Sequence, residues 1–385
     1  MIKKKNAKQI FLLSLTFLLA IFLCISLSGC KQNEDNYLYL ISKKYVPTNA
    51  EIVEKDKYNC AAIKLTKNRN IKVLQLTDVH IGNGALSVKK DKKAFEAMAK
   101  LIENACPDLI ILTGDVVYPN TLLTGNNDNL TALKKVANFI EQYKTPWTMC
   151  FGNHDAEWKA LYGKNVLCDY LESDELKYCL FSRGEADVGI GNHVVNIYNF
   201  DNSFNSSMFI LDNGEYEGSG QISGYLPISD YQTDWYKNTV LQISSDVGYT
   251  IQSFAYFHVP VAEYQTAWRL HKEGSSEVKY FYGVANENGE KISVPNSPSN
   301  FFSTAEMLGS TKAMFCGHNH LNDFSIEYKG IRLTFGKSID YTAYVLQGIT
   351  SKTEQRGATL LTLKGLNSSM ENNFEITPIK LVDIK

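Results

Sequence analysis

Two histidines stand one residue apart in the stretch Gly317-His318-Asn319-His320, in a chain that has only seven histidines. They are either surface residues of a loop or ligands that enter one pocket from a short turn. Four other short motifs contain side chains of the same kinds: Asp78-Val79-His80, Gly114-Asp115, Gly152-Asn153-His154-Asp155 and the lone His258. Imidazole, carboxylate and amide groups without a thiolate suit Zn, Fe or Mn. The five motifs together favour a metal site over a solvated loop.

The number of candidate groups bears on the kind of metal site. These groups are Asp78, His80, Asp115, Asn153, His154, His258, His318 and His320. They exceed what one ion with open positions uses and are enough for two. Two ions ~3.5–4 Å apart can bind both the attacking and the leaving oxygen of a displacement and lower the pKa of a bridging water from ~15.7 to about 7. The chemistry that this set suits is therefore an in-line displacement in which hydroxide is available at neutral pH.

Each motif directly follows an apolar run with the length and composition of a buried strand. These runs are 71–76, 108–113, 146–151, 251–257 and 312–316. Helical patterns cover 87–105, which begins at Ser87 and ends before Pro107, and 127–143. Alternation of strands and helices predicts an α/β fold. In such folds ligands gather beyond the carboxyl ends of the strands, where all five motifs would lie.

The remaining segments give weaker signals. Strands are predicted within 189–200, 206–216 and 356–363, a helix over 229–244, and a hairpin over 324–336. Residues 263–300 are polar and rich in Gly, Asn, Ser and Pro, which predicts a loop over the site.

The N-terminus has the pattern of a secretory signal peptide. Lys3, Lys4, Lys5 and Lys8 precede an apolar run from Ile10 to Leu27, and Leu27-Ser28-Gly29-Cys30 follows. The last four residues resemble a bacterial lipobox, in which Cys30 becomes the lipid-carrying N-terminus. An uncleaved membrane anchor is the alternative, since ~18 apolar residues can span a bilayer. We expect a signal peptide at 1–29, a lipid-anchored tether and lead-in at 30–69 and the catalytic domain at 70–385. The protein would be extracytoplasmic and anchored to the bacterial cell membrane.

The net charge limits the kinds of binding partner, and the cysteines leave the disulfide state open. Loss of residues 1–29 removes four lysines and no acids, which changes the net charge from −2 to −6. This acidic balance argues against nucleic acid or an anionic lipid surface as a partner. A disulfide among Cys60, Cys168 and Cys179 is compatible with the compartment but is not assigned by the sequence.

The order Asp-x-His, Gly-Asp, Gly-Asn-His-Asp, a lone His and Gly-His-x-His resembles the signature of calcineurin-like metallophosphoesterases. The resemblance spans about residues 70–365. The stretches Gly-Asp-Val-Val-Tyr, Tyr-Phe-His-Val-Pro and Gly-His-Asn-His-Leu-Asn-Asp-Phe look like the branch related to purple acid phosphatases, with its yeast and plant enzymes. The resemblance implies a four-layer α/β/β/α sandwich of two mixed sheets flanked by helices, and a metallophosphoesterase domain at 70–385.

The resemblance also implies roles for the candidate residues. One ion would take Asp78, His80, Asp115 and His320. The other would take Asp115, Asn153, His258 and His318, with Asp115 bridging the two. The ions would be divalent or of mixed valence, drawn from Fe, Mn or Zn. A metal-bound hydroxide would attack the phosphorus, and His154 would act as general acid.

The chain departs from two branches of that family. The protein phosphatases carry Gly-Asp-x-x-Asp-Arg, whereas Val117, Tyr118 and Pro119 follow here. True purple acid phosphatases have Gly in place of His80 and use a tyrosinate where Tyr118 stands. Because an imidazole can fill that coordination position, we expect Tyr118 to be a pocket-wall or packing residue.

Several other residues keep two interpretations. His193 and His271 lie outside the strand-end pattern and are expected to be surface or hydrogen-bonded residues. Asp212 is expected in a turn. Asp155 either orients His154 or caps a helix, and Tyr341 and Tyr344 either line the pocket or pack.

The function expected from these residues is hydrolysis of a phosphorylated small molecule, with a phosphomonoester favoured. A phosphodiesterase or nucleotidase on the same site is the alternative. A catalytically inactive surface-binding lipoprotein is the alternative from another class, although no expected ligand is missing.

Overall fold

The computed structural model describes residues 37–218, 224–344, 355–365 and 373–384. The chain divides into two compact units, residues 1–38 and 39–385, and the description below concerns the second. The predicted signal peptide and Cys30 lie outside the described residues. No helix within these described ranges combines the length and the apolar character needed to cross a membrane.

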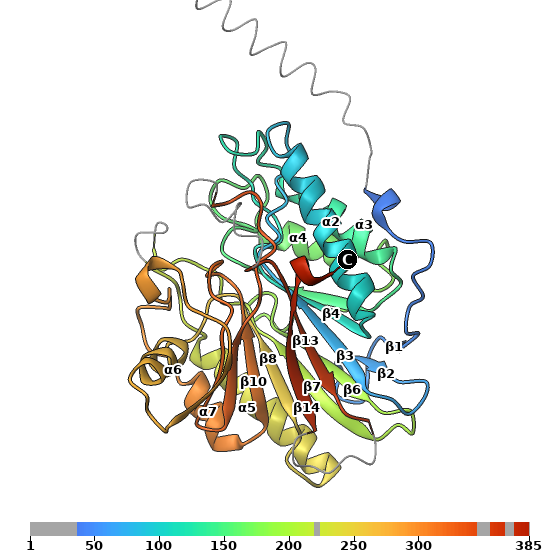
Figure 1. Cartoon of the computed structure of the whole chain (residues 1–385). Coiled ribbons are helices and arrows are strands. Elements are labelled where there is room, and N and C mark those ends of the chain that lie inside the picture. Colours follow the sequence, from blue (N-terminus) through green and yellow to red (C-terminus); the bar gives the residue numbers. More distant parts are fainter. Residues whose placement is uncertain (1–36, 219–223, 345–354, 366–372, 385) are drawn as a thin grey trace, which may run out of the picture. The chain divides into compact units, whose positions relative to one another are not determined.

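Two mixed β-sheets form the centre of the folded unit (Figure 1). The larger sheet has nine strands, in the order β1-β2-β6-β7-β8-β10-β12-β11-β9. Their bounds are Glu51–Val53, Ala61–Lys64, His193–Tyr198, Phe204–Ile210, Ser253–Tyr256, Thr311–Cys316, Ile331–Phe335, Ser325–Tyr328 and Val278–Tyr282. The smaller sheet has the order β14-β13-β3-β4-β5. Its bounds are Phe374–Lys380, Gly357–Leu363, Ile71–Leu76, Leu109–Thr113 and Trp147–Cys150.

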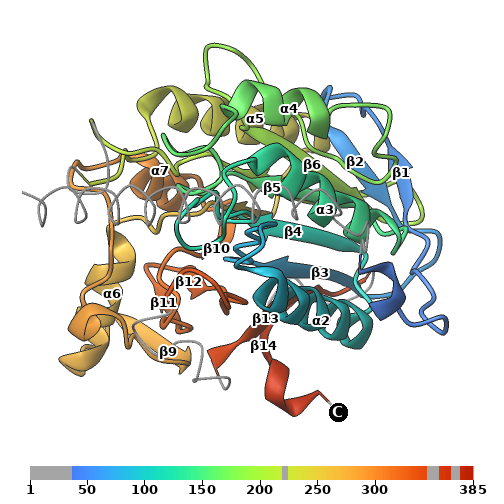
Figure 2. The same cartoon turned by 90° about the horizontal axis from the view of Figure 1, so that it is seen from above.

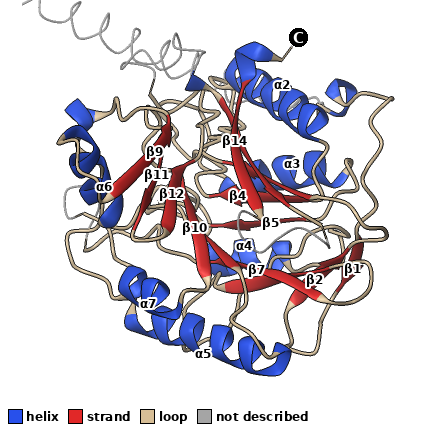
Figure 3. Ribbon diagram, turned by 60° about the horizontal axis from the view of Figure 1, so that its bottom comes forward, coloured by secondary structure: helices blue, strands red, loops and turns tan. Residues whose placement is uncertain are grey.

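Within the part of the chain that the structure describes, six α-helices cover the outer faces of these sheets (Figures 2 and 3). They are α2 (Val88–Ala105), α3 (Asn129–Glu141), α4 (Lys164–Leu171), α5 (Asp230–Val247), α6 (Glu263–Lys272) and α7 (Phe301–Leu308). Helix α2 packs on β3 and β13 of the smaller sheet, and α4 lies beside α3. Apolar side chains of α5, α6 and α7 form one core with the larger sheet.

A second apolar core fills the space between the two sheets. It joins Val73 and Ile111 of the smaller sheet to Met208, Phe254 and Phe315 of the larger one. These strands are apolar on both faces because each sheet is covered on one side by helices and on the other by its partner sheet. The result is the predicted α/β/β/α sandwich.

The five predicted strands that precede the motifs are present as β3, β4, β5, β8 and β10. Strands β3, β4 and β5 are parallel neighbours, as are β8 and β10. Their carboxyl ends therefore point in a common direction within each sheet. The nine-stranded sheet also contains β1 and β2, so residues 39–69 belong to the folded unit and are more than a lead-in.

The expectation of a loop at 263–300 was wrong. Residues in this range form α6 and the edge strand β9, which pairs with β11. Tyr264, Ala267 and Trp268 of α6 are buried, and their i, i+3, i+4 spacing is that of an amphipathic helix. The high polar content of the segment hid this short apolar face. All six described cysteines are free thiols.

Candidate metal centre

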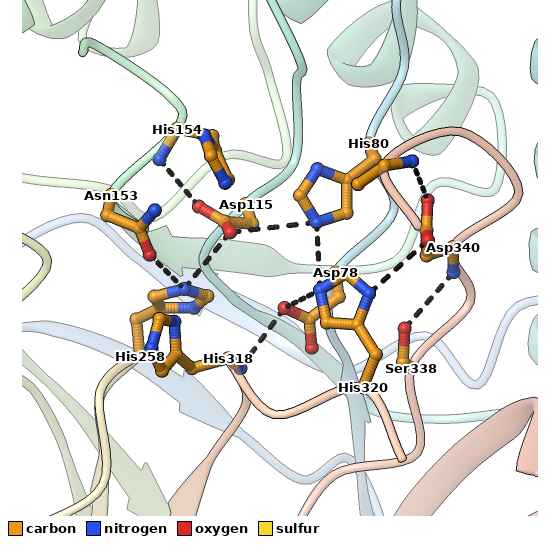
Figure 4. Close-up of polar contacts among 12 residues, drawn as sticks. Asp78, His80, Asp115, Asn153, His154, His258, His318, His320, Ser338 and Asp340 are labelled. Atoms are coloured by element: carbon orange, nitrogen blue, oxygen red, sulfur yellow. Dashed lines mark hydrogen bonds and ion pairs between the residues drawn. The ribbon is translucent and has the colours of Figure 1, made fainter. Parts of the chain in front are cut away.

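All eight candidate side chains come together beyond the ends of five strands (Figure 4). They are supplied by both sheets. Asp78 and His80 follow β3, Asp115 follows β4, Asn153 and His154 follow β5, His258 follows β8, and His318 and His320 follow β10. Residues separated by more than 200 positions in the sequence are thus in direct contact, as Asp78 and His320 show.

The backbone of the ligand loops is strained. Asp78, His80, Asp115 and His318 have φ angles of 51°, 52°, 50° and 76°. A non-glycine residue rarely adopts this left-handed conformation, and such strain clusters at functional sites. The positive φ turns each side chain away from its strand direction and toward the shared centre.

Two of the motif glycines allow these loops to approach closely. A Cβ atom on Gly152 would overlap Asp115 Oδ1, and one on Gly317 would overlap Thr77 Oγ1. The neighbouring atoms belong to other ligand loops, which are themselves held in place. Glycine at these positions is therefore required by the spacing of the ligands and not only by the turn.

The acidic and imidazole groups form two buried clusters that share one carboxylate. Asp78, His80, Asp115 and His320 have ligand atoms within 4.8 Å of one another, and so do Asp115, His258 and His318. Asn153 Oδ1 lies 3.1 Å from His258 Nε2 and so adjoins the second cluster. This arrangement is consistent with a binuclear metal site in which Asp115 serves both ions.

The polar atoms of the site fit bound cations. His80 Nε2 and His320 Nε2 face each other at 3.1 Å. Two neutral imidazoles whose lone pairs point at each other repel, unless a proton or a cation lies between them. Within the described residues, buried Asp78 Oδ2 has no hydrogen-bond partner. Unsatisfied buried groups are destabilising, and a positive ion beside this oxygen would relieve the penalty.

Hydrogen bonds outside the clusters fix two of the imidazole rings. His258 Nδ1 lies 2.8 Å from the carbonyl oxygen of Thr113, and His320 Nδ1 lies 3.3 Å from Asp340 Oδ2. In each ring this leaves Nε2 directed at the centre. Metal-ligating histidines commonly have such a partner on the other nitrogen, which sets the ring orientation.

Asp340 was not among the candidates from the sequence. Its side chain is buried and accepts hydrogen bonds from the backbone N–H groups of Thr342 and Ala343. These bonds fix the carboxylate that holds His320. The sequence gives little indication of this, since Asp340 follows a strand only after a four-residue connection.

The carboxylates and imidazoles of the site shift one another's pKa values. Burial alone would raise the pKa of Asp115, but the charges of His258 and His154 outweigh it and hold that pKa well below its usual value. Burial likewise disfavours charged His258, but the Asp115 carboxylate raises the pKa of His258 to about 9. Burial lowers the pKa of His318 to about 3. Since a metal ligand must be a neutral imidazole, ion binding would displace protons from this site.

His154 occupies a different position from the ligands. Its backbone N–H donates to Asp115 Oδ1 at 2.8 Å, and its Nδ1 lies 3.2 Å from Glu157 Oε1. Glu157 is buried, with its side chain 1% exposed. Burial would lower the pKa of His154, but Asp115 and then Glu157 outweigh it and raise that pKa.

Glu157 was also missed from the sequence. It stands three residues after His154, and the chain between them turns so that the two side chains meet. Glu157 supplies a carboxylate beside His154 in a chain whose motif lacks the Asp-Arg pair after Asp115. The i, i+3 spacing of His154 and Glu157 was the one feature of the sequence that could have indicated this contact.

Aromatic rings surround the centre. Tyr118 lies edge-on to His80 and His154, with ring centroids 5.2 and 4.9 Å away, and is buried. Tyr344 lies 4.3 Å from the His320 ring and Tyr225 lies 4.5 Å from the His318 ring. Tyr341 instead packs against the guanidinium of Arg356. Tyr118 and Tyr344 thus pack against histidines of the centre, and Tyr341 packs away from them.

The structure also shows the contacts of residues whose roles the sequence left open. Asp155 accepts hydrogen bonds from the N–H groups of Gly152 and Val117, so it joins two ligand loops and neither orients His154 nor caps a helix. His193 is buried and hydrogen-bonded to Thr148. His271 stacks on Tyr280.

Comparison with known proteins gives a family match. The family model described as "Calcineurin-like phosphoesterase" matches residues 71–322. "Probable inactive purple acid phosphatase 29" of Arabidopsis thaliana is 27% identical over 73% of this chain and 75% of its own length. "Phosphatase DCR2" of Saccharomyces cerevisiae is 25% identical over 68% of this chain and 46% of its own length.

A solved structure shares the fold. The crystal structure of a dimetal phosphatase from Danio rerio aligns with a TM-score of 0.51 and 11% identity, covering 81% of this chain and 96% of that one. At this identity the likeness extends to the architecture alone.

Proposed function

The chain belongs to the calcineurin-like phosphoesterase family, and we propose that it hydrolyses phosphate monoesters of small molecules with two bound metal ions. The single observation that carries the proposal is the pair of buried clusters joined by Asp115. The word phosphatase in the printed names of the two relatives above, one of which is called probable inactive, supports a monoester. A phosphodiester or nucleotide substrate on the same site is the alternative.

Each ion would have its own set of residues. Asp78, His80, Asp115 and His320 would hold one ion, and Asp115, Asn153, His258 and His318 would hold the other. When bound, a pair of Fe, Mn or Zn ions supplies hydroxide at neutral pH, because such ions lower the pKa of water from ~15.7 to about 7. His80 and Asp115 therefore serve the ions and leave proton transfer to another residue.

His154 is the proton donor in this proposal. Its Nδ1 is paired with Glu157 at 3.2 Å, so Nε2 is the nitrogen free to donate to the leaving oxygen. Glu157 fixes the ring and favours its charged form. A positioned general acid contributes about 10²–10⁴ in rate.

Turnover of p-nitrophenyl phosphate and bis-p-nitrophenyl phosphate tests the proposal, with Mn²⁺, Zn²⁺ or Fe²⁺ added. We expect metal-dependent hydrolysis with the monoester preferred. Preference for the diester would favour the phosphodiesterase. Absence of turnover with both metal positions filled would favour the inactive binding protein. The Arabidopsis relative is likewise named as probable inactive.

Two substitutions separate metal binding from chemistry. His154→Ala should keep both ions and lose most of kcat, whereas Asp115→Ala should lose metal and activity together because one carboxylate serves both clusters. Metal content by mass spectrometry distinguishes the two. A His154→Ala protein that has lost its ions would show that the assigned roles are wrong.

We also propose that the protein is a membrane-anchored, extracytoplasmic lipoprotein. The support is the basic stretch, the apolar run and Leu27-Ser28-Gly29-Cys30. Mass spectrometry of the mature protein should find a lipid-modified Cys30 at its N-terminus, and Cys30→Ala should block this processing. An unmodified chain that begins near Met1 would contradict the lipoprotein.

A further inference from the structure

Three loops beside the metal centre expose large apolar side chains. Leu122 is 87% exposed, Trp158 78% and Leu86 62%. Single exposed apolar residues are ordinary, but a group of them marks an interaction site. The group is called the apolar rim below, and it consists of Leu86, Val88, Leu122, Leu123, Trp158 and Leu161.

Backbone hydrogen bonds join the three loops into one surface. The N–H of Leu86 donates to the carbonyl of Thr124 at 3.0 Å, and the N–H of Leu161 donates to the carbonyl of Asn127 at 2.9 Å. The loop that contains Leu122 therefore lies between the other two. All three loops lie beside the N-terminal end of α2, at the top of Figure 1.

The charge next to the rim residues is mainly basic. Segments 83–90, 119–127 and 158–164 contain four lysines and no aspartate or glutamate. Of the acids that directly flank these segments, Asp91 and Glu157 are buried, and the side chain of Asp128 caps α3. The lysines are Lys89, Lys90, Lys159 and Lys164. Lys164 is paired with Asp212 and Glu215, and Lys159 lies 4.0 Å from buried Glu157. Lys89 and Lys90 remain beside Leu86 and Val88, where their ammonium groups can reach an anionic surface.

We propose that the apolar rim docks on an anionic lipid bilayer. Apolar side chains that protrude from short loops suit insertion among acyl chains, and Trp158 is of the type that settles at the membrane–water boundary. Lysines beside them can extend to headgroup phosphates while their stems lie on apolar surface. A protruding tryptophan can also anchor a protein interface, and the basic charge beside the rim is what favours an anionic bilayer here.

The net charge of the chain does not oppose this docking. The mature net charge of −6 argued against an anionic lipid surface, but that value sums over the whole molecule. Headgroup attraction decays within a Debye length of ~8 Å at physiological salt. The lysines next to the rim therefore matter more than acidic residues on distant faces.

Docking would also match the predicted anchor and the position of the metal centre. Six residues, 31–36, separate the proposed lipid-carrying Cys30 from Tyr37, and they span at most ~22 Å. The rim loops follow directly after the ligand motifs at Asp78, Asp115 and Asn153. Trp158 and Asn153 both line a cavity of about 670 Å³. The docked protein would present this cavity to the lipid headgroups.

Fluorescence of the full chain in vesicles tests the proposal without depending on hydrolysis. The vesicles contain phosphatidylglycerol and phosphatidylcholine with brominated acyl chains, which quench inserted tryptophan. The contribution of Trp158 is the difference between the wild type and Trp158→Phe. We expect clear quenching of Trp158, reduced at least about twofold by Leu122→Ser/Leu123→Ser or Lys89→Gln/Lys90→Gln, and by omission of phosphatidylglycerol.

Matched substitutions on other faces serve as controls. Met307→Ser removes an apolar side chain that is 68% exposed on α7, and Lys237→Gln/Lys279→Gln removes two lysines. Both should leave the quenching of Trp158 unchanged, and all variants should keep the thermal melt of the wild type. Absence of Trp158 quenching, or equal quenching in rim and control variants, would overturn the proposal. If Trp158 is not quenched, and a protein partner binds the wild type but not the rim variants, the rim is a protein interface and the lipid proposal is overturned.

Discussion

Replacement of Glu157 by Gln should slow hydrolysis most for substrates whose leaving group must be protonated as it departs. In the structure, Glu157 Oε1 lies 3.2 Å from His154 Nδ1, and its side chain is 1% exposed. Gln keeps the shape and an acceptor oxygen but loses the negative charge. The substitution therefore removes the charge that favours protonated His154 and leaves the metal ligands untouched.

The expected size follows from this geometry. A carboxylate at this distance favours the protonated form of an imidazole by ~1.4–4 kcal/mol, which corresponds to about 10- to 1,000-fold in the rate of a step that uses the proton. We expect kcat for glycerol phosphate to fall by this factor, because an alkoxide leaves poorly without a proton. For p-nitrophenyl phosphate we expect a fall of about threefold or less, since that leaving group departs as an anion.

The pH profile gives a second measurement of the same effect. The Glu157 carboxylate contributes to the raised pKa of His154, and a raised pKa keeps the imidazole protonated to higher pH. Removal of the carboxylate lowers that pKa, so the alkaline limb of kcat for glycerol phosphate should move to lower pH in Glu157→Gln. Glu157→Asp, which keeps the charge, should retain more activity at high pH than Glu157→Gln.

Stopped or continuous assays of both esters, with metal content measured on the same samples, decide the question. Glu277→Gln, a change on an exposed segment, controls for the substitution itself and should match the wild type. An equal loss for both esters, or a loss of bound metal, would refute the reasoning and assign Glu157 a structural role.

Three further outcomes follow from the centre. Tyr118→Phe should retain metal and most activity, whereas His80→Ala should lose both, and the iron-loaded protein should show no intense visible band that Tyr118→Phe removes. Asp340→Asn should keep the fold and weaken Mn²⁺ binding by ~10–100-fold, measured by titration, because it loosens the orientation of His320. Removal of metal by a chelator should lower Tm by about 4 °C for each ion lost. An ion at 100 times Kd stabilises the native state by ~2.7 kcal/mol, and a folded unit of roughly 350 residues shifts ~1.4 °C per kcal/mol. An unchanged Tm would argue that the buried Asp115 cluster binds no ion.

The strands and the ligand motifs of this protein could be predicted from the sequence because both are local patterns. Ile71–Leu76 was located to the residue from its apolar composition alone. The polar motif that ends each run could then be assigned to the carboxyl edge of a sheet. The order of five motifs was enough to indicate a site with two metal ions and its family.

The sequence did not reveal contacts whose partners meet only after packing. Asp340 reaches His320 because the hairpin of β11 and β12 returns the chain to the centre. The turn after His154 brings Glu157 to its ring. Helix α6 was mistaken for a loop because only three of its ten residues are buried.

The surface charge also has one part that the sequence determines and one part that only the tertiary structure determines. Net charge is a sum over residues and is fixed by composition, which gave an acidic protein. The grouping of Leu86, Leu122 and Trp158 beside Lys89 and Lys90 arises because three loops, 30 to 40 residues apart in the chain, all leave the metal centre at the same edge. Composition has no information about distance in space, so only the tertiary structure could place apolar and basic side chains on one face.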